Sequence, residues 1–414
     1  MEAHDLQIER RRRFREARRA VVKLGTSVVT GAGGEVSAER VMPVVRALSE
    51  LRWEGRGVVL VSSGAVGLGA GRLGLARARL GDVVVRQACA AVGQSLLMHA
   101  YEKLFSAYGV KIAQVLLTED DFTDRRRYSN LQRTMERLLK LGVVPVVNEN
   151  DTVSTAELEY VGRGRERVFS DNDRLAALVM SKLESDALVL LSDVDGLLVP
   201  RPPDTLSGVE HDEDSMVLPL VAEVTPELKA LAAGPSATGR GGMLTKLEAA
   251  EIAMRAGGVA VIANGTRADT LTRVFAGEGV GTAFIPASRM AGKRRWIAYA
   301  AGVRGRVVVN AGAREAILRG KASLLASGVV RVEREFEPQD VVSNAGPEGR
   351  EFARGIANCA SREASASIAR ADVGDAPGAG QRRKAGVLVT RDNIVILEGL
   401  PENNIEPATA RAES

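Results

Sequence analysis

The stretch AVVKLGTS, residues 20–27, is a short apolar run that ends in a glycine and two hydroxyl residues, with a lysine inside it. Five runs of the same kind follow: GVVLVS (57–62), VKIAQVLL (110–117), GVVPVVN (142–148), DALVLLS (186–192) and GGVAVIAN (257–264). Continuous apolar runs of this length are typical of strands that are buried on both faces of a parallel sheet.

Amphipathic stretches separate these runs, at residues 37–54, 82–108, 126–140, 171–184 and 243–256. Strands that alternate with helices form right-handed crossovers, which place helices on both faces of a sheet. The sequence therefore predicts an α/β fold, a three-layer helix–sheet–helix domain with a mainly parallel sheet. Ser37 is the predicted N-cap of the first helix.

The pattern of apolar and polar residues changes after about residue 303, where short strand-like runs alternate with turn signals. This pattern predicts a small, mostly β module. We predict four parts: a basic extension (1–18), the α/β domain (19–300), the β module (301–400) and a disordered tail (401–414). The extension carries most of the arginine run ERRRRFREARR (9–19), and we interpret it as a solvated arm.

The composition narrows the possible classes of protein and kinds of site. Hydrophobic residues make up 45% and charged residues 26% of the chain, and the net charge is only +4, which is typical of a soluble globular protein. Cys89 and Cys359 have no metal-ligand spacing, so we expect a reducing, cytoplasmic compartment. His4, His99 and His211 form no cluster, which speaks against a histidine base or a zinc site. No apolar stretch is long enough to predict a membrane span.

Two lysines are the strongest candidates for chemistry. Only 10 of the 56 basic residues are lysines, so the ordinary surface cation of this chain is arginine. Lys23 lies at the end of the first apolar run, and Lys246 lies where the glycine turn of GRGGMLTKLEAA (239–250) enters a helical pattern. A lysine beside free backbone N–H groups suits an anion, and two such sites suit a phosphoryl group held from both sides during transfer.

Polar residues gather where the predicted strands end, and ligands of open parallel sheets bind beyond the carboxyl ends of the strands. Ser63 follows the second run. Asn148 ends the fourth run and Asp151 comes soon after it, while Ser192 ends the fifth run and Asp193 follows it. Asn172 and Asp173 lie at the start of the helix predicted from residue 171. We expect these turns to meet at one edge of the sheet.

The motifs KLGTS, VSSGA, PVVNENDTV, SDNDRLAALVM, LLSDVDGL and GRGGMLTKLEAA resemble, in order, those of the glutamate 5-kinases of the amino acid kinase family. The resemblance covers about residues 19–290. Two later segments, 305–333 and 349–358, resemble a PUA domain. The resemblance implies an ATP- and Mg²⁺-dependent transferase that phosphorylates the γ-carboxylate of L-glutamate to L-glutamate 5-phosphate, the first step of proline biosynthesis.

The resemblance also implies roles for single residues. Lys23 and Lys246 would neutralise charge on the transferring phosphoryl group, and Asp173 would orient both lysines. Glutamate would be held by Ser63, Asn148, Asp151 and Asn172. The nucleotide would be held by Lys23, Ser192, Asp193 and the loop Arg240, Gly241, Gly242, Met243, Leu244, Thr245 and Lys246. The resemblance implies no metal-ligating residue. It implies that proline is a feedback inhibitor and that glutamyl phosphate reductase is a partner. The implied assembly is a homo-oligomer, either a dimer or a tetramer.

Other functions remain open at this point. An RNA-binding or RNA-modifying protein would act through the PUA-like module and the arginine run, but aromatic residues are only 4% of the chain, which speaks against nucleic acid. A dinucleotide-binding enzyme would use Gly69, Gly71 and Gly74 as G-x-G-x-x-G, although this match begins seven residues after Ser62. A P-loop kinase is excluded because its motif is absent from the sequence.

Overall fold

A computed structural model describes residues 3–31, 33–118, 120–153, 172–200, 215–232, 242–286, 297, 303–320, 322–372 and 386–397. The chain divides into two compact units, Met1–Gly292 and Lys293–Ser414. The predicted disordered tail (401–414) lies outside the described residues. The predicted domain boundaries at residues 18, 300 and 400 stay predictions.

The first unit is built on one sheet of eight strands in the order β3-β4-β2-β1-β5-β9-β10-β8. Its strands are β1 (Arg19–Leu24), β2 (Gly57–Ser62), β3 (Ile112–Leu117), β4 (Val144–Glu149), β5 (Ala187–Ser192), β8 (Leu220–Val221), β9 (Val259–Asn264) and β10 (Thr282–Phe284). All neighbouring pairs are parallel except β9 and β10. The prediction of a mainly parallel sheet is confirmed, and the six apolar runs are six of its strands.

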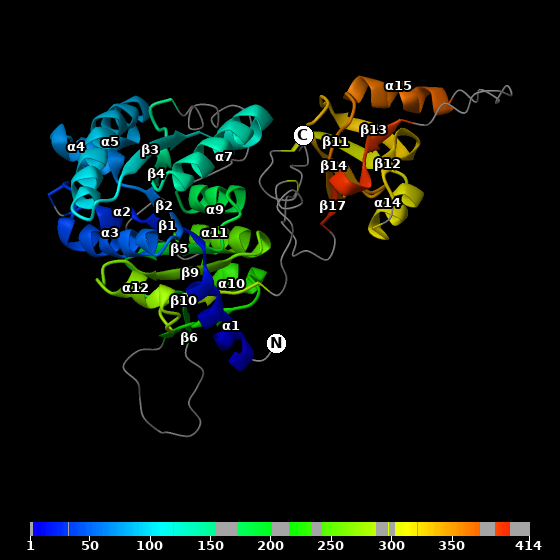
Figure 1. The fold of residues 1–414 in the computed structure, drawn as a ribbon. Helices are drawn as coiled ribbons and strands as arrows, with labels where there is room; N and C mark the ends of the chain where they lie inside the picture. Colours follow the sequence, from blue (N-terminus) through cyan, green and yellow to red (C-terminus); the bar gives the residue numbers. More distant parts are fainter. Residues whose placement is uncertain are drawn as a thin grey trace, which may run out of the picture. The chain divides into compact units, whose positions relative to one another are not determined.

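Helices cover both faces of this sheet, as Figure 1 shows. On one face lie α3 (Ala38–Trp53), α5 (Val83–Ser106) and α12 (Thr270–Phe275); on the other lie α7 (Arg125–Lys140), α9 (Asn172–Lys182) and α11 (Met243–Arg255). Strands β1, β2, β5 and β9 are buried along nearly their whole length, because each has helices on both sides. The predicted three-layer sandwich is confirmed.

Shorter elements connect these layers: α2 (Thr26–Val29), α4 (Ala65–Arg72), η1 (Arg77–Gly81), α6 (Asp120–Thr123), β6 (Leu198–Pro200), β7 (Ser215–Val217) and α10 (Pro226–Leu231). Asp124 caps α7, since its side chain accepts from the backbone N–H groups of Arg126 and Arg127. Ser37 stands at the N-cap of α3 but forms no side-chain cap bond. In the described ranges no helix is both long and apolar enough to cross a bilayer.

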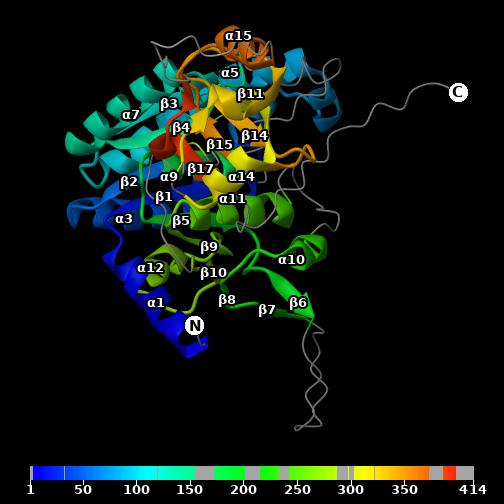
Figure 2. The same ribbon diagram turned by 90° about the vertical axis from the view of Figure 1, so that its right-hand side faces the viewer.

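The amino-terminal arm is a docked helix, α1 (Ala3–Glu16), so its prediction as a solvated arm is wrong. Leu6, Arg10 and Phe14 are buried and stand four residues apart, so they form one stripe of the helix. The Phe14 ring meets Phe275 of α12 edge-on at 6.4 Å. Figure 2 shows α1 beside α12, at the end of the sheet. The count of arginines concealed this stripe, because most of the other arginines of the helix are exposed.

Arg10 fastens the arm to the edge of the sheet, although its side chain is charged. Its guanidinium donates from Nη2 to the carbonyl oxygen of Val280 at 2.5 Å and from Nη1 to that of Pro219 at 3.4 Å. These carbonyls lie next to β10 and β8, so a residue near the start of the chain is bound to the last strands of the unit. Burial lowers the pKa of Arg10.

The first glycine of the G-x-G-x-x-G match, Gly69, serves helix packing. Gly69 and Gly71 lie inside α4, and a Cβ atom on Gly69 would stand 1.8 Å from the carbonyl oxygen of Cys89 in α5. A dinucleotide fingerprint needs its glycines in the turn between a strand and a helix. The dinucleotide alternative therefore has no structural basis.

The second unit contains a sheet of five strands in the order β13-β11-β14-β15-β17. Its strands and helices are β11 (Val303–Val309), α14 (Ala311–Leu318), β12 (Leu324–Leu325), η3 (Ala326–Gly328), β13 (Val329–Arg334), β14 (Val341–Ala345), β15 (Glu351–Ile356), α15 (Ser361–Asp372), β16 (Val387–Val389), η4 (Arg391–Asn393) and β17 (Ile394–Ile396). Its own apolar core includes Val307, Val342 and Phe352. The predicted small, mostly β module is confirmed.

Candidate active site

One buried carboxylate holds two lysines at the carboxyl edge of the sheet. The Nζ atom of Lys23 lies 2.7 Å from Oδ1 of Asp173, and the Nζ atom of Lys246 lies 3.1 Å from Oδ2. The Asp173 side chain is fully buried, while those of the two lysines are 7% and 8% exposed. Two positive charges therefore share one negative charge, which leaves a net positive charge in a nearly dry place.

Three elements bring these charges together. Lys23 is the last residue but one of β1, Asp173 is in the first turn of α9, and Lys246 is near the start of α11. Helices α9 and α11 pack side by side on the same face of the sheet. The packing of these two helices, whose residues are mostly buried, thus positions the ion pairs.

Asp173 stays ionised in spite of its burial. Burial alone would raise the pKa of its carboxyl, but the charges and hydrogen bonds of Lys23 and Lys246 outweigh this effect and hold the pKa below its usual range. Thr245 adds a hydroxyl at 3.4 Å from Oδ2. The carboxylate is therefore an acceptor for the lysines and is unsuited to act as a general base.

Beside this cluster, Asn172 connects the predicted glutamate-binding residues. Its Nδ2 atom donates to Ser63 Oγ at 3.0 Å, to Asn148 Oδ1 at 2.9 Å and to the carbonyl oxygen of Ser62 at 3.1 Å. Asn148 in turn donates from Nδ2 to Oε1 of Gln94 at 2.9 Å. The structure therefore joins three of the four predicted glutamate residues and connects them to Gln94, which the sequence analysis did not name.

Gln94 carries no signal that would have found it. It lies in the middle of α5, between Gly93 and Ser95, and not in a turn after a strand. Asp151, the fourth predicted glutamate residue, lies half-buried in the turn after β4. Residues 154–171, which follow this turn, lie outside the described residues.

The predicted nucleotide residues lie on the other side of Lys23. Ser192 ends β5, the direct neighbour of β1, and its hydroxyl donates to Asp193 at 3.0 Å. Gly242, Met243, Leu244 and Thr245 form the start of α11, whereas Arg240 and Gly241 lie outside the described residues. Gly242 is the N-cap and supplies no side-chain bond to the first N–H groups of the helix. Free N–H groups at a helix start attract phosphate, and Lys246 stands in the next turn.

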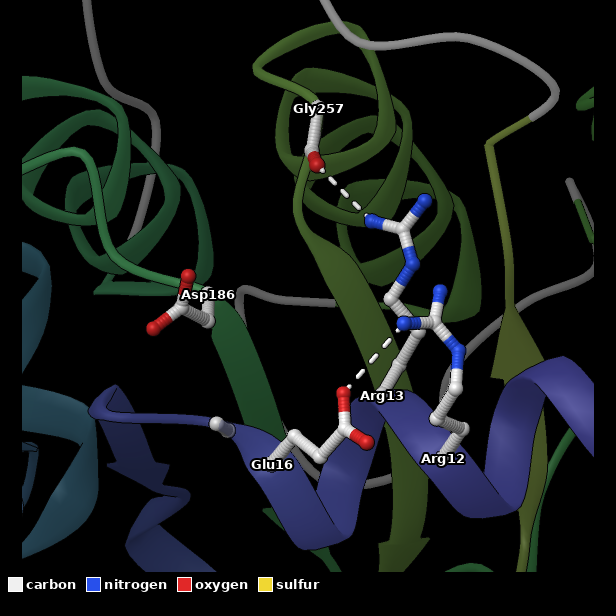
Figure 3. Close-up of a pocket in the computed structure, with 6 residues that line it drawn as sticks. Arg12, Arg13, Glu16, Asp186 and Gly257 are labelled. Atoms are coloured by element: carbon white, nitrogen blue, oxygen red, sulfur yellow. Dashed lines mark hydrogen bonds and ion pairs between the residues drawn. The ribbon is translucent and has the colours of Figure 1, made fainter.

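A pocket of about 290 Å³ lies at the opposite, amino-terminal edge of the sheet. It is lined by Arg12, Arg13, Glu16, Ala17, Asp186 and Gly257, as Figure 3 shows. Arg13 donates to the carbonyl oxygen of Gly257 at 3.2 Å, and Arg12 pairs with Glu16 at 3.2 Å. The charges of this pocket already neutralise one another and fasten α1, so we do not place the chemistry there.

Comparisons with known proteins show which family the chain resembles. The model of the amino acid kinase family matches residues 18–264, and that of the PUA domain matches residues 305–371. A glutamate 5-kinase from Moorella thermoacetica is 44% identical over 386 residues, which cover 92% of this chain and 97% of that protein. One from Myxococcus xanthus is 46% identical over 348 residues (83% and 87%), and one from Cupriavidus metallidurans 43% over 384 residues (92% and 98%).

The buried carboxylate leads to a prediction about stability. Replacing Asp173 with Asn should lower the free energy of unfolding by about 3 kcal/mol or more at pH 7, because two buried ammonium groups lose their counter-ion. A pKa held below the usual value of 3.8 stabilises the fold above that pH, and this stabilisation is lost as the pH falls through the folded-state pKa. The gap between wild type and variant should therefore stay constant above about pH 5 and shrink below about pH 4.

Urea denaturation of both proteins across this pH range measures the gap. Asp195→Asn is the matched control, because Asp195 pairs with Arg267 at 2.7 Å but both side chains are about half exposed. That change should cost less than about 1 kcal/mol. Equal losses for both variants, or a gap that widens in acid, would contradict the assignment of a buried shared carboxylate.

Proposed function

Because the chain belongs to the amino acid kinase family, and within it to the glutamate 5-kinases, we propose that it transfers the γ-phosphoryl group of ATP to the γ-carboxylate of L-glutamate. The products are L-glutamate 5-phosphate and ADP. The observation that carries this function is the pair of buried lysines on Asp173 beside the amide cluster of Asn172 and Asn148.

The reaction needs charge neutralisation more than it needs a base. An oxygen of the γ-carboxylate attacks the γ-phosphorus of ATP, and the bond from that phosphorus to the bridging oxygen of ADP breaks. The nucleophile is already ionised, so no proton has to leave. The obstacle is the repulsion between two anions, which Lys23 and Lys246 relieve where the phosphoryl group passes. Asp173 keeps both ammonium groups in place.

The nucleotide side is suited to phosphates. The N–H groups at the start of α11 and the Nζ atoms of the two lysines supply donors and positive charge, and Ser192 and Asp193 are proposed to meet the adenosine end. Among the described residues no group of three or more acidic, histidine or cysteine side chains could hold a metal ion. We therefore propose that Mg²⁺ is held mainly by the phosphates of ATP, where it would offset their charge.

The amino acid side is suited to an acidic zwitterion. We propose that Ser63, Asn148 and Asn172 hold glutamate through their hydroxyl and amide groups, and that Asp151 attracts the α-ammonium. These residues lie at or just after the ends of β2 and β4 or begin α9, so the substrate would lie across the same edge as the lysines. This arrangement directs the γ-carboxylate toward the phosphoryl group.

The function is tested with a coupled assay of ADP release over a panel of acidic amino acids. We expect L-glutamate to be the preferred acceptor, and hydroxylamine should trap the acyl phosphate as the hydroxamate. The proposal is wrong if aspartate or N-acetylglutamate is preferred, or if ADP release does not depend on an amino acid.

The two-lysine site predicts the effect of changing Lys246. Lys246→Ala should lower kcat by roughly 10²-fold or more, since charge stabilisation at the transferring phosphoryl group is lost. The KM for glutamate should change far less, because other residues bind that substrate. Lys246→Arg should not restore the full rate, since a planar guanidinium cannot replace a compact ammonium.

Lys103→Ala is the control for this measurement, because Lys103 is exposed on α5, away from the carboxyl edge. It should leave kcat and KM near those of the wild type. A folded Lys246→Ala protein that binds ATP and keeps nearly the full kcat would show that Lys246 does not stabilise the transferring group.

We also propose feedback inhibition by proline. Proline carries an α-carboxylate and an ammonium group as glutamate does, so the groups that hold these parts of glutamate can hold it as well. The proposed segment, 148–172, is described only at 148–153 and at Asn172. Millimolar proline should raise the apparent KM for glutamate in the ADP assay, and an unchanged KM would refute the proposal.

Three further proposals concern the surroundings of the enzyme. The labile acyl phosphate suggests coupling to glutamyl phosphate reductase, which a pull-down and a channelling assay would test. A homo-oligomer, dimer or tetramer, would be recognised by its mass in solution. A cytoplasmic location agrees with the free Cys89 and Cys359, and cell fractionation would test it.

RNA binding by the PUA module gains no support from the site. A gel-shift assay would reveal such binding.

A further inference from the structure

Helix α5 sends two side chains to the amino acid side of the site. Gln94 accepts a hydrogen bond from Asn148, and Tyr101 lies seven residues later, on the same face of the helix. The Tyr101 hydroxyl lies 2.8 Å from Oγ of Ser62, the residue before Ser63. Helix α5, which bears none of the family motifs, is thereby connected to the ends of β2 and β4, where the proposed glutamate residues Ser63 and Asn148 lie.

The backbone of α5 is held close to the turn that carries Ser63. A Cβ atom on Gly93 would stand only 1.7 Å from the carbonyl oxygen of Ala65, the first residue of α4. Any side chain at Gly93 would therefore push α5 away from α4. Since Gln94 is the next residue and Ala65 closely follows Ser63, this contact fixes the distance between Gln94 and the substrate turn.

Three side-chain amides form a chain of hydrogen bonds in which each residue donates to the next. Asn172 donates from Nδ2 to Oδ1 of Asn148, and Asn148 donates from Nδ2 to Oε1 of Gln94. Each link uses a donor of one residue and an acceptor of the next. The chain therefore ends in a spare acceptor, Oδ1 of Asn172, and in a spare donor, Nε2 of Gln94.

Both end atoms are buried and have no hydrogen-bond partner among the described residues. A buried polar atom without a partner is costly, so such atoms are usually satisfied by a ligand or by water. A zwitterionic amino acid offers what the two ends lack, because its ammonium group donates and its carboxylates accept.

We propose that Gln94 is a further substrate-binding residue, which donates from Nε2 to the α-carboxylate of glutamate while Oδ1 of Asn172 accepts from the ammonium group. This inference rests on the proposed function. The α-carboxylate is assigned because Gln94 is at the end of the amide chain away from Asp173 and its lysines, where the γ-carboxylate reacts. An uncharged donor suits this place, since a cation there would compete with the lysines for the γ-carboxylate.

The test compares Gln94→Glu and Gln94→Ala with the wild type. Gln94→Glu keeps an acceptor for Asn148 but replaces the donor with a negative charge. The KM for glutamate should rise about tenfold to a hundredfold, because a hydrogen bond to a charged group is lost and a like charge is added. The kcat at saturating glutamate should stay within a few fold, since the lysines are untouched. Gln94→Ala should raise the KM in the same direction.

A substrate analogue separates binding from a structural role. 4-Aminobutyrate is glutamate without the α-carboxylate, so its Ki as a competitor of glutamate should stay unchanged or fall in Gln94→Glu. If the Ki and the KM rise together, Gln94 acts only on the shape of the pocket and the proposal is overturned. An unchanged KM in Gln94→Glu also overturns it, because the donor would then not face a carboxylate.

The control variant is Ser95→Ala, since Ser95 is the exposed neighbour of Gln94 and its hydroxyl only bonds to the carbonyl oxygen of Val92. It should leave KM and Ki unchanged. Melting temperatures of all variants report folding, and Gln94→Ala decides the question if Gln94→Glu does not fold. If the wild type itself releases no ADP with glutamate, the proposed function has failed, and with it the premise of this inference.

Discussion

The carboxylate of Asp173 is the group on which the rest of the site depends. Two ammonium groups in a nearly dry place would repel each other and would each lose the hydration that water gives them. One carboxylate, with one oxygen for each lysine, makes their coexistence possible. The remaining positive charge is what an anionic phosphoryl group would meet. A single ion cluster thus connects the stability of the fold to the chemistry.

Two consecutive residues divide this site into two functional sides. Asp173 faces the lysines, whereas Asn172 faces Ser63 and Asn148. Successive residues of a helix point about 100° apart, so the first turn of α9 can serve both sides at once. Any shift of α9 would move both residues and would disturb the lysine cluster and the amide cluster together. The mostly buried residues of α9 make such a shift costly.

The two edges of the sheet have different roles. The carboxyl edge holds open donors and paired lysines, whereas the amino edge is closed by α1 and by ion pairs among Arg12, Arg13 and their neighbours. Composition suggested that the arginines near the start of the chain form a solvated arm. The periodicity of Leu6, Arg10 and Phe14 decides otherwise. Leu6 and Phe14 bury apolar surface and Arg10 bonds to backbone carbonyls, so the helix is docked although most of its other positions are charged.

The sequence by itself determined the three-layer fold, the strand ends that carry polar residues and the two lysines, because strand and helix periodicity and turn chemistry are local properties. The roles assigned to Lys23, Lys246, Asp173 and the glutamate residues came from motifs, and the structure places most of these residues together.

Only the tertiary structure decided that both lysines share one carboxylate, that Gln94 joins the amide chain and that α1 is docked. These facts depend on which atoms of distant segments come into contact, and this is set by packing between helices and sheet. No local pattern in α5 distinguishes Gln94 from any other polar residue of a helix, because its partner lies 54 residues away in the chain.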